Sequence, residues 1–165
     1  MFKAEYFSPF GSLVLIADNG KLLYCNWNTQ DCKVKENNII INLHNKETQE
    51  DRLIVKKTIA QLNEYFLGKR QTFELPVDFK GTEFQKLVWE KIYQIKYGET
   101  VTYKELAQRM GRPDALRAVA GACGANPIGI IVPCHRVISS SGKTGGYTGG
   151  IDKKISLLNL EKSAV

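Results

Sequence analysis

The residues of this chain best suited to chemistry are a cysteine and a histidine that are adjacent in the sequence, Cys134 and His135. The thiolate is the nucleophilic form of cysteine, and an imidazole within reach can take the thiol proton. Pro133 stiffens the backbone before the thiol, because its ring fixes φ and restricts the preceding residue. Apolar residues at 130–132 and 137–138 predict two buried, strand-like segments on either side. The pattern predicts a buried, activated thiol, although a bare Cys-His pair is also compatible with no catalytic role.

Positive charge is concentrated in the second half of the chain. The 165 residues carry a formal net charge of +6. Residues 1–80 contain 11 Lys/Arg and 10 Asp/Glu, whereas residues 81–165 contain 12 and 7, which leaves a net charge of +5 in the second half. A basic half favours a polyanionic partner, nucleic acid before membrane, since no basic amphipathic helix stands out. A basic surface that serves only solubility is the alternative on charge alone.

Cysteine usage and hydropathy indicate a soluble intracellular protein. The four cysteines are irregularly spaced and do not form a disulfide framework. No apolar run is long enough to span a membrane, and the first residues do not resemble a signal peptide. The 43% hydrophobic content is sufficient for a packed core. We therefore expect one ordinary domain or two small ones.

The first third of the chain predicts a small β-sheet followed by a helix. Three strand-like runs are separated by turn residues, and Asn19-Gly20 is a strong hairpin signal because both residues tolerate positive φ. A helix with apolar positions at Leu53, Ile59, Leu62 and Phe66 is expected to end at a glycine. The expected strands are residues 2–8, 12–17 and 21–27, the exposed loop 28–38, the helix 47–67, and the linker to a second unit 73–81.

The second unit contains strong signals for the starts of helices. Thr82 with Gln85 and Thr102 with Glu105 form two capping boxes, and Asp114 can cap a third helix. These helices are expected to end near residues 96, 110 and 123. Two short helices joined by a glycine-containing turn form a helix-turn-helix pattern. The same pattern is at least as frequent in proteins with no role on DNA.

The last of these helices has an unusual outward face. Spacing places Leu116, Val119, Ala120 and Cys123 toward the core, and Arg117, Ala118, Gly121, Ala122 and Ala125 outward. A face with one projecting cation and otherwise very small side chains suits close approach to a narrow groove or a backbone. It does not suit base reading in the major groove, which needs long polar side chains. Simple helix packing through Ala and Gly is the alternative.

The helix pair, Asn126-Pro127 and the Pro-Cys-His-Arg-Val core together resemble the O6-alkylguanine-DNA alkyltransferases, the methylated-DNA–protein-cysteine methyltransferases. The resemblance covers essentially the whole chain and is most specific between residues 98 and 161. It implies an N-terminal α/β domain of ribonuclease H-like topology, with a small antiparallel sheet plus helix, at 1–75. A linker at 76–81 would lead to a mostly helical, winged-helix-like helix-turn-helix domain at 82–165, which binds DNA and accepts the alkyl group.

The resemblance also implies a reaction. Cys134 would accept an alkyl group from O6 of guanine, and also from O4 of thymine, in a single irreversible step. His135 would remove the thiol proton through a water, Glu161 would orient His135, and Asn126 would act as the hinge between the helix and the active-site loop. Independently, Glu161 lies at the margin of an apolar helical face, where a carboxylate without a partner is costly. A solvated Glu near a frayed C-terminus, and an ordinary Asx turn at Asn126, are the simpler alternatives.

The partner implied by the resemblance is double-stranded DNA with an alkylated guanine, bound through the minor groove by a monomer without cofactor or metal, in the cytoplasm or, in a eukaryote, the nucleus. Arg117 would fill the space of the extruded base. The implied DNA contacts are Tyr103, Arg117, Ala118, Gly121, Ala122 and Arg136, and the implied base pocket is Tyr103, Val132, Tyr147, Thr148 and Gly149.

Departures from the family pattern concern substrate range and zinc. Thr148 replaces a common serine, and Gly129 replaces a second proline of some relatives that packs on bulky alkyl groups. Cys25, Cys32 and His44 do not fall at the zinc positions of other relatives.

Two other functions remain open: a non-catalytic alkyltransferase-like binder of damaged DNA, which would lack the acceptor cysteine, and a Cys-His hydrolase, which would need an oxyanion hole.

Overall fold

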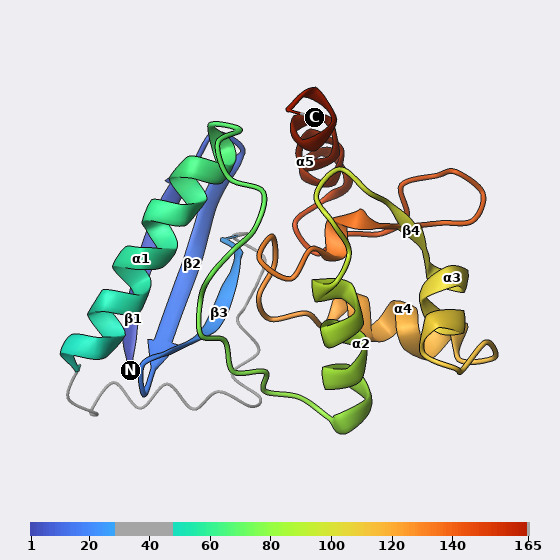
Figure 1. Ribbon diagram of the computed structural model, residues 1–165, viewed down its shortest axis with the longest axis horizontal. Helices are drawn as coiled ribbons and strands as arrows, with labels where there is room; N and C mark the ends of the chain where they lie inside the picture. Colours follow the sequence, from blue (N-terminus) through green and yellow to red (C-terminus); the bar gives the residue numbers. More distant parts are fainter. Residues whose placement is uncertain (29–47, 165) are drawn as a thin grey trace. The chain divides into compact units, whose positions relative to one another are not determined.

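The computed structural model describes residues 1–28 and 48–164, which fall into two compact units, Met1–Asp78 and Phe79–Val165 (Figure 1). The first unit contains the predicted antiparallel sheet, in the order β1-β2-β3. Asn19 and Gly20 both adopt positive φ between the last two strands, as the hairpin signal required. The strands are β1 (Phe2–Ser8), β2 (Gly11–Asp18) and β3 (Lys21–Trp27). This agrees with the expected α/β architecture of the first part of the chain.

One helix, α1 (Gln49–Phe66), packs along the sheet (Figure 1). It begins at Thr48, whose side chain accepts a hydrogen bond from the Asp51 amide, and the chain turns away at Gly68 with a φ of 70°. The predicted apolar face of this helix was partly wrong, because Leu53 is 62% exposed. The buried face instead runs through Asp51, Ile54, Val55, Thr58, Gln61, Leu62 and Tyr65. The predicted loop at 28–38 lies almost entirely outside the described residues, as do Cys32 and His44.

The segment predicted as a linker is packed against the sheet for part of its length. The Leu22 amide donates to the Pro76 carbonyl at 2.8 Å, and the Asp78 amide donates to the Leu22 carbonyl at 3.0 Å. Phe73 and Leu75 are buried. This stretch therefore extends the first unit up to Asp78.

Helices dominate the second unit, which supports the predicted helical C-terminal domain. Thr82 and Thr102 both form their predicted capping boxes. Asp114 does not cap the next helix, whose N-cap is Ala115 and has no side-chain hydrogen bond. The elements are α2 (Glu83–Tyr93), β4 (Val101–Thr102), α3 (Tyr103–Arg109), α4 (Leu116–Gly124), the 3₁₀ helix η1 (Cys134–Arg136), β5 (Val137–Ile138) and α5 (Ile151–Ser163). Among the described helices, none combines the length and apolar composition needed to cross a bilayer.

The predicted faces of α4 needed correction. Leu116 is 45% exposed and Ala120 is exposed, whereas Ala122 is only 3% exposed. The reason is the position of α2, whose Trp89 donates its ring N–H to the Ala122 carbonyl at 2.8 Å. This packing rotates Ala122 into the core and leaves Arg117, Ala118 and Gly121 exposed.

Candidate active site

Cys134 lies in a pocket of about 400 Å³ within the second unit. The lining residues are Tyr103, Ala120, Cys123, Gly124, Cys134, Gly146, Tyr147 and Thr148. They come from α3, α4, η1 and the loop before α5. Three of them on α4 carry small side chains or none, so the backbone of α4 can approach whatever occupies the pocket. Val132 and Gly149, both predicted to line a base pocket, are not among these described lining residues.

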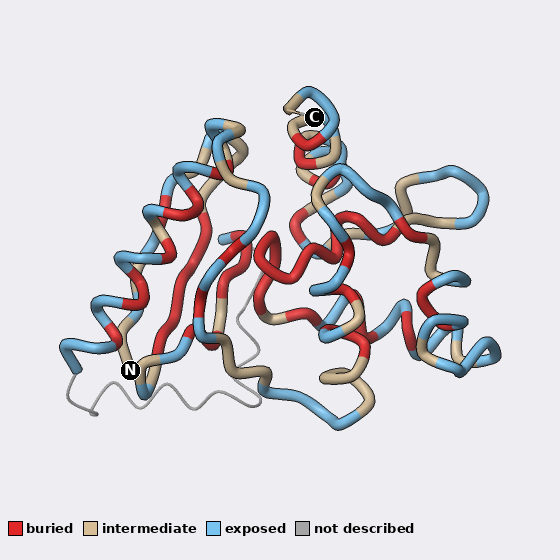
Figure 2. The backbone as a smooth tube through the Cα atoms, in the orientation of Figure 1, coloured by how far each residue is buried: buried red, intermediate tan, exposed pale blue. Residues whose placement is uncertain are grey.

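The backbone that presents the thiol is buried along residues 128–137 (Figure 2). Residues 130–132 were predicted to be strand-like; they are buried but form a tight turn. Ile130 adopts a φ of 69°, which costs a β-branched residue about 1–3 kcal/mol and persists only where the surroundings enforce it. Turn hydrogen bonds, such as the one from the Val132 amide to the Ile128 carbonyl at 2.9 Å, hold this conformation.

Asn126 ties this turn to the thiol. Its side-chain amide donates to the Val132 carbonyl at 2.9 Å, and its side-chain oxygen accepts from the Ile128 amide at 3.0 Å. The same side chain also hydrogen-bonds Cys134. Asn126 follows directly on α4 and its C-cap, so its three contacts couple that helix to the thiol.

The electrostatics of Cys134 combine opposing effects. The side chain is 8% exposed, and burial raises its pKa because a thiolate loses hydration. The hydrogen bond from Asn126, the positive charge of Lys154 and the local backbone amides act in the opposite direction. Burial prevails, so the resting group is a thiol, and a nucleophilic sulfur requires a base.

His135 and Glu161 form a buried pair next to the thiol. His135 Nε2 lies 2.6 Å from Glu161 Oε1, and neither side chain is more than 1% exposed. Burial raises the pKa of Glu161, but the hydrogen bond and charge of His135, together with Arg136, lower it to about 2. An ionised carboxylate can only accept, so Nε2 carries the proton and Nδ1 keeps its lone pair. Nδ1 is buried and has no hydrogen-bond partner among the described residues.

Arg136 is not where the sequence prediction placed it. It was expected to contact DNA, but it is only 5% exposed. Its Nε donates to Glu161 Oε2 at 2.9 Å, and another guanidinium nitrogen donates to Glu161 Oε1 at 2.9 Å. A guanidinium held in this way is not available to phosphates, so Arg136 is removed from the predicted DNA contacts.

Lys154 belongs to the same site and was missed by the sequence analysis. It is fully buried, and its ammonium group donates to the Val137 carbonyl at 2.6 Å and the Gly146 carbonyl at 3.4 Å. It also lies 5.9 Å from the centre of the Tyr103 ring. Counting back from Glu161 by helical spacing reaches Leu157 and then Lys154, and this signal could have identified it.

The remaining predicted residues separate into two groups. Tyr103, Tyr147 and Thr148 line the pocket, and Thr148 Oγ1 donates to the Gly124 carbonyl at 2.9 Å. Burial, with the two nearby thiols, raises the pKa of Tyr103 to about 12, so its hydroxyl is a proton donor at neutral pH. The exposed group is Arg117, Ala118 and Gly121 on α4. Ala122 is buried and cannot make the predicted contact with DNA.

Both halves of the chain match models of one protein family. Residues 1–79 match the ribonuclease-like domain of 6-O-methylguanine DNA methyltransferase, and residues 83–163 match its DNA-binding domain. The methylated-DNA–protein-cysteine methyltransferase of Methanosarcina acetivorans is 40% identical over 163 residues, or 99% of each chain. The Mycobacterium tuberculosis enzyme of the same name is 54% identical over 105 residues. That alignment spans 64% of this chain and 64% of the relative, less than two thirds of its length.

Solved structures show the same fold. A crystal structure of a single-residue variant of Mycobacterium tuberculosis OGT matches with a TM-score of 0.85 and 40% sequence identity, covering 99% of this chain and 93% of that one. The crystal structure of Mycobacterium tuberculosis OGT in complex with DNA matches with a TM-score of 0.80 and 40% identity, covering 98% and 92%.

Proposed function

The chain belongs to the 6-O-methylguanine DNA methyltransferase family, and from this membership we propose that it repairs DNA by moving an alkyl group from O6 of guanine to Cys134. The observation that carries the proposal is the buried Cys134 in a pocket, with the His135–Glu161 pair next to it. The pocket has a volume of about 400 Å³ and would receive the alkylated base, and His135 retains a basic nitrogen that no described residue occupies.

The reaction is a single displacement at the alkyl carbon. His135 Nδ1 takes the thiol proton through a water, and the sulfur attacks the alkyl carbon as the bond from that carbon to O6 breaks. The products are an uncharged thioether on Cys134 and a guanine whose departing charge is stabilised by donors in the pocket. The Tyr103 hydroxyl is such a donor. No later step releases the thioether, so each molecule acts once.

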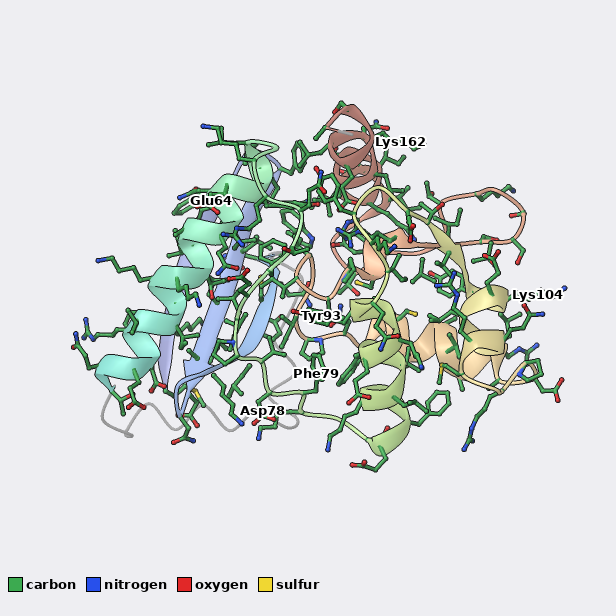
Figure 3. The ribbon with its side chains drawn as sticks, viewed as in Figure 1. Glu64, Asp78, Phe79, Tyr93, Lys104 and Lys162 are labelled. Carbon is green, nitrogen blue, oxygen red and sulfur yellow. The ribbon has the colours of Figure 1, made fainter. Side chains whose placement is uncertain are left out.

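DNA is the proposed partner, approached through the minor groove. The exposed face of α4 offers Arg117 among Ala118 and Gly121, which permits close approach to a narrow groove. Lys104 extends into solvent from α3, in the same helix pair (Figure 3). Because O6 lies on the major-groove edge of guanine, a protein bound in the minor groove can reach the alkyl group only if the target nucleotide leaves the duplex, and Arg117 would occupy its place. Mycobacterium tuberculosis OGT has been crystallised with DNA, which supports DNA as the class of partner.

The proposal extends to a second substrate, to the number of copies that act together and to the place of action. Alkyl transfer from O4 of thymine uses the same thiol, and a single copy of the chain contains every residue of the proposed reaction. The place of action is the compartment that holds DNA, the cytoplasm of a cell without a nucleus. A non-catalytic role in binding damaged DNA is not favoured, because the acceptor thiol lies in the pocket.

A titration tests the proposed function. With excess duplex containing O6-methylguanine, we expect transfer to stop at one methyl group per protein, because a thioether is not displaced. Mass spectrometry of the digested protein should place the group on Cys134. Continued turnover would indicate a hydrolase, absence of transfer would indicate a binding protein, and a methyl group on Cys123 would refute the assignment of the acceptor.

The alkylated protein should be less stable than the unmodified one. Adding a methyl group to a packed site typically costs about 1–3 kcal/mol. Alkylation also disturbs the contact between Cys134 and Asn126, which couples the thiol to the chain that follows α4. Since 1 kcal/mol lowers the melting temperature of a small domain by roughly 4–8 °C, a difference of several degrees is expected. Thermal melts of matched samples measure it, and an equal or higher melting temperature after alkylation would show that the pocket already accommodates the methyl group.

A further inference from the structure

The guanidinium of Arg136 holds both oxygens of the carboxylate that contacts His135. We propose that Arg136 is a positioning residue for alkyl transfer, which fixes Glu161 against His135 and balances the charge of Glu161 so that the imidazole stays neutral until the thiol gives up its proton. The inference rests on the proposed function, because it adds Arg136 to the pair formed by Glu161 and His135, the base of that reaction.

The geometry leaves the carboxylate little freedom. Arg136 donates to Oε1 and Oε2 of Glu161, each at 2.9 Å, while Oε1 also lies 2.6 Å from His135 Nε2. The Gly98 amide donates to Oε2 at 3.3 Å. Two-point contacts of this kind fix the plane of the carboxylate as well as its distance. Arg136 therefore holds the carboxylate in the orientation in which Oε1 faces His135 Nε2.

Arg136 is itself held in place by contacts that do not involve the reaction. One of its nitrogens donates to the Ile95 carbonyl at 2.6 Å, and its guanidinium carbon lies 5.6 Å from the centre of the Tyr97 ring. These contacts come from the segment that follows α2. The guanidinium thus connects that segment to α5, which carries Glu161, by contacts on both sides.

The second effect of Arg136 is on charge. The charged or titratable groups around His135 are Glu161 and Lys154 from α5 and Cys134 and Arg136 from η1, with Tyr97 next to the Glu161–Arg136 pair. Burial lowers the pKa of His135; Glu161 acts against this, whereas Arg136 and Lys154 reinforce it. With Arg136 present, the carboxylate is paired and attracts an imidazole proton less strongly. Without Arg136, the buried negative charge of Glu161 has His135 as its main partner, which favours the imidazolium.

The imidazole can be observed directly, because the chain has only two histidines, His44 and His135. In a His44→Gln background, the remaining imidazole is titrated by NMR without DNA or alkyl substrate. The variants are Arg136→Gln, which removes the charge but keeps a donor, and Arg136→Lys, which keeps the charge but replaces a two-point contact with one. The double variant Arg136→Gln/Glu161→Gln removes both members of the pair.

We expect the pKa of His135 to rise above its ordinary value of 6.5 in Arg136→Gln, to rise less in Arg136→Lys, and to fall back below 6.5 in the double variant, where burial and the charge of Lys154 act without an opposing carboxylate. In an unfolded chain the pKa of His135 would lie near 6.5, so neither the raised pKa of the single variant nor the lowered pKa of the double variant can come from loss of structure. If Arg136→Gln does not fold, Arg136→Lys and the double variant still give the two opposite shifts. An unchanged or lower pKa in the folded single variants would overturn the proposal.

The rate of alkyl transfer from free alkylated guanine gives an independent measurement. A neutral His135 is needed to take the thiol proton, so the variants should lose rate at low pH and approach the wild type at high pH. A loss that is uniform across pH would indicate a structural role only. If the wild type transfers no alkyl group while the pKa pattern holds, the proposed function fails and the effect of Arg136 on His135 through Glu161 stands.

Discussion

Replacing Cys134 with alanine should abolish alkyl transfer while binding to undamaged duplex remains unchanged. Removing a nucleophile from enzymes that depend on one lowers rates by about 10⁴-fold or more, and no other described group lining the pocket has equivalent activation. Binding is expected to survive because phosphate contacts arise from exposed cations, whereas Cys134 is 8% exposed. Single-turnover transfer from methylated duplex and a binding titration on unmodified duplex measure the two quantities separately.

Cys123 provides the matched control, since it lines the same pocket. Burial, with the nearby Cys134, raises the pKa of this second thiol to about 12, so it contributes negligible thiolate. Cys123→Ala should therefore retain one transferred alkyl group per protein. Loss of transfer in Cys123→Ala together with retention in Cys134→Ala would reverse the assignment.

Replacing Arg117 with alanine should slow repair of duplex DNA much more than reaction with free alkylated guanine. Extruding a nucleotide costs a few kcal/mol, and each 1.4 kcal/mol corresponds to about a tenfold change, so a loss of roughly 10–100-fold on duplex is expected. A free base has no stack to leave, and its rate should match the wild type. Arg117 is exposed on α4, whereas His135 and Glu161 are buried.

Arg112 is the matched control for this variant, because it is an exposed arginine in the turn before α4. Arg112→Ala should weaken binding to duplex DNA by a factor that depends on salt concentration, as expected of a phosphate contact. It should not slow reaction on duplex much more than reaction with free alkylated guanine, as Arg117→Ala does. Placing the lesion opposite a mismatched base should partly restore Arg117→Ala, since an unpaired base is easier to extrude. Equal slowing of Arg117→Ala on duplex and free base would assign Arg117 to folding or to the pocket.

Local sequence determined the elements whose causes are local. Thr82 and Thr102 begin their helices because the capping partner lies three residues away in each case. Asn19-Gly20 forms the hairpin because the turn itself requires positive φ. The pairing of Cys134 with an adjacent imidazole was also visible, since both residues are neighbours in the chain. The opposite outcome at Asp114 shows the limit, because a capping residue does not guarantee that the helix begins there.

Tertiary structure decided which way the residues around the thiol face. Arg136 follows His135 directly, and nothing in the local sequence distinguishes a DNA contact from an ion pair with Glu161, 25 residues further on. Ala122 was assigned to the outer face by helical spacing, but it is buried where α2 packs against α4 and Trp89 donates to its carbonyl. Lys154 is buried because carbonyls from β5 and the pocket loop converge on its ammonium group. These outcomes depend on contacts between segments distant in sequence, and such contacts are made only when the elements pack together.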